Sequence, residues 1–332
     1  MTKPILDHMK SLNFYIIGLA LMITHGKMIC QITDPKKQER FRLLSIKNEN
    51  EGLAEPFKGI SGQDGQVQDG LFRINSTGVS TSKVQKAANT FLKTLDNGQR
   101  QKVSFPIDDD EWRKWMNQHF YVRQGVGFVD MSEKQRQAAF DLMRSSLSAQ
   151  GLKLSRDIMR LNHTLGEINN NFEEYGEWLY WITIMGNPSD TEPWGWQMDG
   201  HHLIINYFVL GDQVVMTPLF VGSEPVIAES GKYKGIQILQ TEQQSGLDMI
   251  RSLNHEQQNE AVIEVSKDGN NNLTEAFKDN VVLEYAGVSA SSFSIKQKEQ
   301  LLQLIKLFVD NMDEGHAKVK MEEVANHIDD TR

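Results

Sequence analysis

The chain has 332 residues, of which 39% are hydrophobic and 24% are charged, and its formal net charge is −9 at pH 7. This composition is typical of a folded globular protein rather than a disordered chain. The acidic balance argues against a general affinity for nucleic acid or anionic membranes, because a negatively charged protein gains little from counterion release on phosphates. We therefore expect a small molecule, a sugar or a peptide as the ligand.

The N-terminal segment has the pattern of a signal peptide. Lys3 and Lys10 precede an uninterrupted apolar run, Phe14–Ile23, which is too short to span a bilayer comfortably. We therefore predict a signal peptide at residues 1–30, export to the periplasm or the exterior, and no transmembrane segment in the mature chain. A buried cytosolic helix is the alternative interpretation. Cys30 is the only cysteine, so no internal disulfide forms.

The compact part of the chain is expected to begin near Leu71. Before it, residues 31–70 are polar and end in a glycine-rich stretch, which predicts a flexible polar arm. After it, residues 71–332 are expected to form a single α+β domain.

Apolar residues recur at helical spacing through the first half of this domain. They predict four helices, at residues 80–95, 108–119, 132–151 and from 155 onward. The third helix opens with a capping box, Ser132 to Gln135.

In the second half of the domain, the sequence pattern changes to short segments rich in aromatic and β-branched residues. Strands are expected at residues 178–185, 202–210, 214–218, 236–239 and 261–265, and helices at 246–253, from 294 onward and within 313–332. Gly211-Asp212 is a two-residue hairpin signal. Because helices and strands come in runs without βαβ alternation, the pattern indicates an α+β fold, with N-terminal helices followed by an antiparallel sheet and further helices packed on it.

The stretch Trp194–Leu203 (WGWQMDGHHL) is the most informative part of the chain. Imidazole and carboxylate groups close together are suited to a metal site, so Asp199, His201 and His202 are candidate metal ligands and catalytic groups. In an extended chain His201 and His202 would point to opposite faces. The first would then lie with Asp199 and the second with Asn206. The alternative is structural: a buried, hydrogen-bonded histidine beside tryptophans that anchor the core.

A second cluster precedes this stretch. His119 and Arg123 lie within five residues of each other beside aromatic residues, and they are candidates for binding a carboxylate or a sugar. A core histidine and a buried arginine salt bridge are the alternative. Glu173, Glu174 and Glu177 have the pattern of a solvated charge run.

The leading functional hypothesis is a metal-assisted hydrolase with a divalent metal ion, because no dinucleotide, Walker, HExxH or GxSxG motif is found. A mononuclear iron or copper oxidase fits the same ligands. The competing class is a non-catalytic periplasmic binding protein, whose ligand would contact Trp194, Trp196, Gln197, Asn206, His119 and Arg123. A structural protein without a small-molecule site is the third hypothesis. The sequence does not fix the oligomeric state.

Several segments resemble one family of mostly bacterial proteins, known only as a domain of unknown function, number 3500. They are Gly78–Thr81, Arg123–Val126, Glu174–Tyr180, Trp194–Leu203, Val215–Pro218 and Gly222–Pro225. The resemblance covers about Gly70 to the C-terminus and implies an exported protein without an assigned reaction. It also implies a further segment rich in His, Asp, Asn and Tyr beyond Arg332, so the chain is expected to be C-terminally incomplete relative to the family.

Overall fold

The computed structural model describes residues 35–71, 74–266 and 279–332. Its contacts divide the chain into two units, Met1–Arg40 and Phe41–Arg332. The predicted signal peptide lies outside the described residues. Helix α1 (Pro35–Leu53) falls within the predicted polar arm, so part of this segment is helical, and its flexibility stays a prediction.

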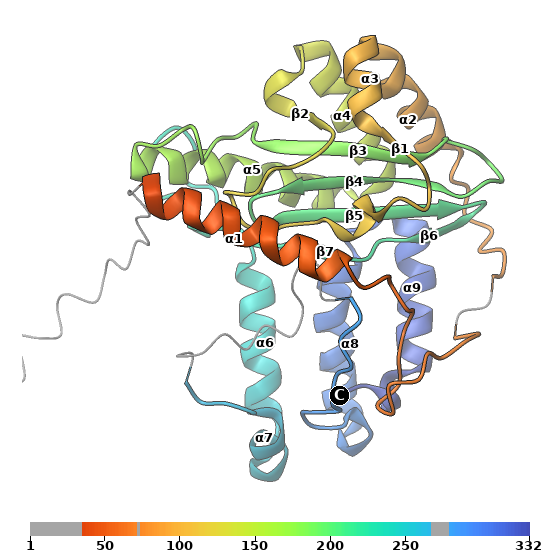
Figure 1. The fold of residues 1–332 in the computed structure, drawn as a ribbon. Coiled ribbons are helices and arrows are strands. Elements are labelled where there is room, and N and C mark those ends of the chain that lie inside the picture. Colours follow the sequence, from red (N-terminus) through yellow and green to blue (C-terminus); the bar gives the residue numbers. More distant parts are fainter. Residues whose placement is uncertain (1–34, 72–73, 267–278) are drawn as a thin grey trace, which may run out of the picture. The chain divides into compact units, whose positions relative to one another are not determined.

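Among the described residues, a mixed seven-stranded sheet forms the centre of the second unit (Figure 1). Its order is β1-β3-β4-β5-β6, with β2 also paired to β3 and β7 to β5. Of the pairings described, β1 with β3 is parallel and the others are antiparallel. The strands are β1 (Ser104–Phe105), β2 (Val126–Gly127), β3 (Tyr180–Gly186), β4 (Trp194–Gly200), β5 (Leu203–Leu210), β6 (Gln213–Val215) and β7 (Leu219–Val221).

One face of the sheet packs against helices and forms the main core. These helices are α2 (Ser82–Thr94), α4 (Glu133–Ser146) and α5 (Ala149–Asn169), and short α3 (Asn97–Val103) leads into β1. Every second side chain of β3, β4 and β5 points to this face and packs against the apolar side chains of α4 and α5. Both sets of side chains are thereby buried away from water. The α+β prediction is therefore confirmed.

The opposite face of the central strands is covered by residues 106–125, which we call the strap. The strap contains only one turn of 3₁₀-helix, Asp110–Arg113, and otherwise runs as irregular chain over the sheet. The expected helix at residues 108–119 is therefore wrong. Its acidic start does cap a helical turn, since Asp109 accepts a hydrogen bond from Glu111 N. The residues that follow use backbone atoms to bind the sheet, Met116 N to Asp199 and Asn117 O to His202 N, and so do not continue the helix.

The remaining helices lie below the sheet in the view of Figure 1. They are α6 (Gln240–Ser252), α7 (His255–Ala261), α8 (Ile295–Val309) and α9 (Glu314–Asn326). A small separate core around Met249, Leu253 and Phe293 joins α6, α7 and α8. In the part of the chain that the structure describes, no helix is long and apolar enough to cross a membrane.

Most expected elements are present, with shifted ends. The helices expected at 80–95, 132–151, 246–253 and from 294 correspond to α2, α4, α6 and α8, and a short helix within 313–332 is α9. The two-residue hairpin at Gly211-Asp212 is confirmed, because Leu210 pairs with Gln213. The strands expected at 236–239 and 261–265 are wrong: the first makes one isolated bridge through Gln237, and the second is not a strand. Helices α3 and α7 and strands β1, β2, β4 and β7 were not predicted.

Candidate functional site

The alternating side chains of β4 determine what each residue of the candidate motif does. Trp194, Trp196 and Met198 point to the helix-covered face and are completely buried in the main core. The indole Nε1 of Trp196 donates to Ser146 Oγ at 3.1 Å. Both tryptophans therefore pack the core, and neither indole is open to an external ligand in this structure.

Gln197 and Asn206 lie on the strap face of the sheet, directly opposite each other on β4 and β5. The Gln197 amide donates to Asn206 Oδ1 at 2.8 Å, and the Asn206 amide donates to Trp112 O in the strap at 3.0 Å. These two amides are therefore engaged in holding the strap on the sheet.

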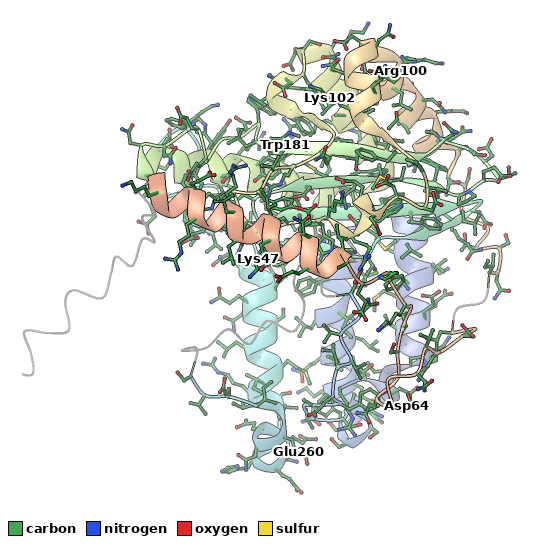
Figure 2. The ribbon with its side chains drawn as sticks, in the orientation of Figure 1. Lys47, Asp64, Arg100, Lys102, Trp181 and Glu260 are labelled. Atoms are coloured by element: carbon green, nitrogen blue, oxygen red, sulfur yellow. The ribbon has the colours of Figure 1, made fainter. Side chains whose placement is uncertain are left out.

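Asp199 shares that face and binds the strap more tightly. Its Oδ1 accepts from Arg123 Nε at 2.6 Å, and its Oδ2 accepts from Met116 N at 3.0 Å. Burial raises the pKa of Asp199 to about 6, and the Arg123 guanidinium opposes this shift. The Arg123 side chain is 2% exposed and lies over the ring of Trp181, labelled in Figure 2. This pair is the buried salt bridge considered as an alternative for Arg123.

His201 and His202 form the two-residue turn between β4 and β5. Gly200 pairs with Leu203 across the hairpin, and His202 has a positive φ of 59°. The strand parity expected from the sequence does not apply here, because the strand ends at Gly200. Instead of facing opposite sides, the two imidazole rings lie together, with centroids 4.1 Å apart.

A third imidazole, from the strap, joins the two at the turn. The ring centroid of His119 lies 5.3 Å from that of His201. Its Nε2 is 3.3 Å from Tyr175 Oη and 3.4 Å from Glu174 Oε2. The strap is held at this end by the turn itself, since His202 N donates to Asn117 O at 2.9 Å. We call His119, His201 and His202 the histidine cluster.

Hydrogen bonds from helix α5 fix the tautomer of His201. The Asn162 amide nitrogen donates to Gly176 O at 2.9 Å, which orients Asn162 Oδ1 toward the ring. Oδ1 can only accept, so His201 Nδ1, 2.8 Å away, must carry the proton. The lone pair of His201 Nε2 is therefore available. His202 Nε2 is buried and has no hydrogen-bond partner among the residues that the structure describes.

All three histidines are uncharged at neutral pH. Burial lowers the pKa of His119 and of His202 to about 4, and nearby Arg123 adds to the effect on His119. The pKa of His201 lies well below its usual value because of burial and the two neighbouring imidazoles. Neutral imidazole is the form that offers a lone pair to a metal ion or to a hydrogen-bond donor.

Sequence reasoning missed three side chains of this site. Asn162 lies in the middle of α5 and has no sequence signal of its own. Glu174, interpreted as part of a solvated charge run, is partly buried beside His119, and burial raises its pKa. Tyr175 is buried next to the same ring. The proximity of these two residues to His119 comes from the loop between α5 and β3, which helical and strand periodicity does not describe.

Within residues 35–71, 74–266 and 279–332, no group of three or more His, Cys, Asp or Glu side chains is arranged to hold a metal ion. The fold and the site define an α+β protein with a cluster of uncharged imidazoles on a hairpin of its central sheet. The chain belongs to the family described as "Protein of unknown function (DUF3500)", whose pattern matches residues 77–332. No match was found among curated proteins or among solved structures.

Proposed function

We propose that the histidine cluster binds a divalent transition-metal ion and that the protein is a metal-dependent hydrolase acting on a small molecule, sugar or peptide. The observation that carries the proposal is the pairing of two adjacent turn imidazoles, 4.1 Å between ring centroids, with a third from the strap. Imidazole nitrogens are common ligands of zinc, copper, iron and nickel.

The low pKa values favour a ligand role over a general-base role. A general base works best with a pKa near the working pH, so an imidazole with a pKa of about 4, such as His202, is a weak proton acceptor at pH 7. A metal ion requires only the unprotonated ring. The hydrogen bond from His201 Nδ1 to Asn162 Oδ1 supports the same role, because ligating histidines usually donate their other N–H to an oxygen.

Asp199 is not part of this proposal as a ligand. Its two oxygens accept from Arg123 and from Met116 N, and releasing them would leave a buried guanidinium without its partner. We assign the ligand role to His201 and His202, with His119 as the third donor. Since the three rings do not converge on one point as they stand, we expect metal binding to rotate at least one of them.

A bound ion of this kind lowers the pKa of its water toward neutrality and so supplies a nucleophile. Glu174 lies 3.4 Å from His119 and is the nearest carboxylate to that ring, so it is the group we expect to accept the water proton. Its raised pKa brings it closer to the range in which a carboxylate exchanges protons at neutral pH.

The test is metal binding by protein prepared without a histidine tag. Elemental analysis and calorimetric titration with Zn²⁺, Cu²⁺, Ni²⁺ and Fe²⁺ should give one ion per chain. His201→Ala and His202→Ala should each weaken binding at least tenfold. His255→Ala and His327→Ala are the matched controls, because both side chains are exposed and lie outside the cluster. Absence of saturable binding for every ion, or equal binding by all four variants, would overturn the proposal.

The same titration separates the hydrolase from the oxidase hypothesis. Stoichiometric iron or copper with ion-dependent oxygen consumption would favour the oxidase, and zinc without oxygen consumption favours the hydrolase. The binding-protein hypothesis has less support, because Trp194 and Trp196 are fully buried and Gln197 and Asn206 bind each other.

We also propose that the chain is exported, on the basis of the apolar run Phe14–Ile23 after Lys3 and Lys10. Sequencing the N-terminus of the protein produced from the full reading frame should find a start between about Gly26 and Gln31. Intact Met1 in a soluble cytoplasmic pool would contradict export.

A further inference from the structure

A cavity of about 230 Å³ is lined by residues of α1, from Arg42 to Glu49, and by residues of the strap, from Glu111 to Gln124. Its lining combines ionisable, amide and apolar side chains, among them Glu49, Glu111, Lys114, Gln124, Ile46 and Val122. None of the three cluster histidines lines it. A site here would therefore be independent of the proposed metal site.

Glu111 is the unusual member of this lining. Its side chain is only 4% exposed, and its Oε2 has no hydrogen-bond partner in the described part of the chain. Its backbone is fixed on both sides: its N donates to Asp109 Oδ1, and its O accepts from the Gln197 amide at 3.4 Å. A buried carboxyl oxygen without a partner costs free energy, so a ligand that bonds to it would recover that cost.

Burial raises the pKa of Glu111 to about 8. Lys114 opposes the shift, while Asp199 on β4, Asp109 before the turn and Glu49 on α1 reinforce it. Arg42 on α1 also lines the cavity. At neutral pH Glu111 is therefore mostly a carboxylic acid, which can donate a hydrogen bond.

Lys114 adds a positive charge next to this acid. Its Nζ is 3.8 Å from Glu111 Oε2 and 4.0 Å from Glu49 Oε1, and both distances are longer than a hydrogen bond. With Lys114 charged and Glu111 protonated, the cavity offers an ammonium and an acid O–H close together. The lining carries two cationic side chains, Lys114 and Arg42, against the Glu49 carboxyl and the protonated Glu111, so an anion is favoured over a ligand amine.

We propose that this cavity binds a small aliphatic carboxylate, held by Lys114 Nζ and by the buried Glu111 carboxyl whose Oε2 has no hydrogen-bond partner in the described residues, with its alkyl part against Ile46 and Val122. The volume corresponds to roughly seven or eight water molecules at about 30 Å³ each, which is room for a molecule of a few carbon atoms. Gln124 supplies a further side-chain amide on the lining.

The experiment is calorimetric titration of the whole chain with sodium propionate at a series of pH values from 6 to 9.5. Propionate should bind one-to-one near pH 6–7, and its affinity should fall about tenfold per pH unit above pH 8 as Glu111 ionises. Propylammonium chloride and inorganic phosphate are the comparison ligands, and both should bind at least tenfold more weakly.

Three variants locate the site. Glu111→Gln keeps a neutral hydrogen-bond donor, so it should bind propionate but lose the decline above pH 8. Lys114→Met should weaken binding at least tenfold. Lys47→Met, on the exposed side of α1 and labelled in Figure 2, is the matched control and should bind like the unmodified chain.

Each contrary outcome overturns the proposal. Failure of the folded chain to bind propionate at pH 6 would exclude a carboxylate site. Stronger binding of propylammonium would mean that Glu111 acts as an anion, and stronger binding of phosphate would exclude the acid–carboxylate pairing. The pH series on the unmodified chain tests the role of Glu111 even where a variant fails to fold.

Discussion

Arg123 and Asp199 join the strap to the central sheet through a buried ion pair, with Arg123 Nε 2.6 Å from Asp199 Oδ1. The same guanidinium donates through Nη2 to the carbonyls of Met116 and Gln118 and through Nη1 to that of Tyr121. One arginine thus satisfies three strap carbonyls and one strand carboxylate. The relationship explains why His119, which lies between these carbonyls, stays next to the turn of β4 and β5.

The first prediction is that Asp199→Ala lowers the free energy of unfolding by about 3–5 kcal/mol, because it leaves the buried Arg123 charge without its partner. Urea denaturation measures the loss. Asp141→Ala is the matched control, since Asp141 pairs with Arg144 at the surface and should cost less than about 1 kcal/mol. Equal losses in the two variants would contradict the structural role of the buried pair.

The second prediction concerns two glycines with opposite surroundings. A Cβ on Gly195 would lie 2.3 Å from Tyr207 O and 2.6 Å from a ring carbon of Trp112, whereas a Cβ on Gly246 in α6 meets nothing within 4 Å. Gly195→Ala should destabilise the fold by about 3 kcal/mol. Gly246→Ala should stabilise it by about 0.5–1 kcal/mol through helix propensity. Thermal or urea unfolding decides, and a tolerated Gly195→Ala would mean that Tyr207 O on β5 and the Trp112 ring lie farther from Gly195.

The third prediction is the tautomer of His201. Because Asn162 Oδ1 accepts from the ring, Nδ1 should carry the proton and Nε2 should be bare at pH 7. Long-range ¹H–¹⁵N correlation spectra of the metal-free chain report this directly. In Asn162→Ala the preference should be lost, while the exposed His255 should give the same spectrum in both proteins. A proton on Nε2 in the unmodified chain would contradict the hydrogen-bond chain from Gly176.

The fourth prediction is a loss of stability in acid that depends on His202. Its pKa is about 4 in the folded chain, against about 6.5 when unfolded, so between these values the unfolded state binds more protons. Stability should therefore fall as the pH is lowered from 6.5 to 4, by about 3 kcal/mol for this residue.

His202→Gln removes the titrating group, so its stability should change less over the same pH range. His255→Gln should behave like the unmodified chain because that ring is exposed. Denaturant titrations of chelator-treated protein at pH 7, 5.5 and 4 give the comparison. Parallel pH curves for His202→Gln and the unmodified chain would show that the ring titrates normally.

Periodicity in the sequence predicted most of the amphipathic helices, but it also predicted a helix at residues 108–119 that the structure does not contain. The capping box Ser132–Gln135 and the hairpin at Gly211-Asp212 predicted the start of α4 and the β5–β6 turn, because both signals are local. Gly151 shows the limit. It was interpreted as a helix end, but it lies inside α5, where a Cβ would approach Asn311 O at 2.3 Å. A glycine is needed at position 151 because the chain at Asn311, far away in the sequence, lies close to it. A local sequence pattern contains no information about such a contact.

The sequence singled out the three histidines of the candidate site, but it did not predict that they lie together. His119, His201 and His202 were singled out from the sequence, and the structure brings these three together. Asp199 was grouped with His201 on the assumption of a continuous strand. The two-residue turn at His201-His202 breaks that alternation, and the carboxylate lies with Arg123 instead. Side chains alternate between the two faces only within a strand. The sequence did not reveal that β4 ends at Gly200.

The most direct test of the metal proposal is X-ray absorption spectroscopy at the zinc edge on the zinc-loaded chain, since it counts the imidazoles bound to the ion. The unmodified chain should show at least two imidazole ligands, and His201→Ala and His202→Ala should each show one fewer or fail to retain zinc. A shell of oxygen donors alone, or an imidazole count unchanged in both variants, would contradict a metal site at the turn between β4 and β5.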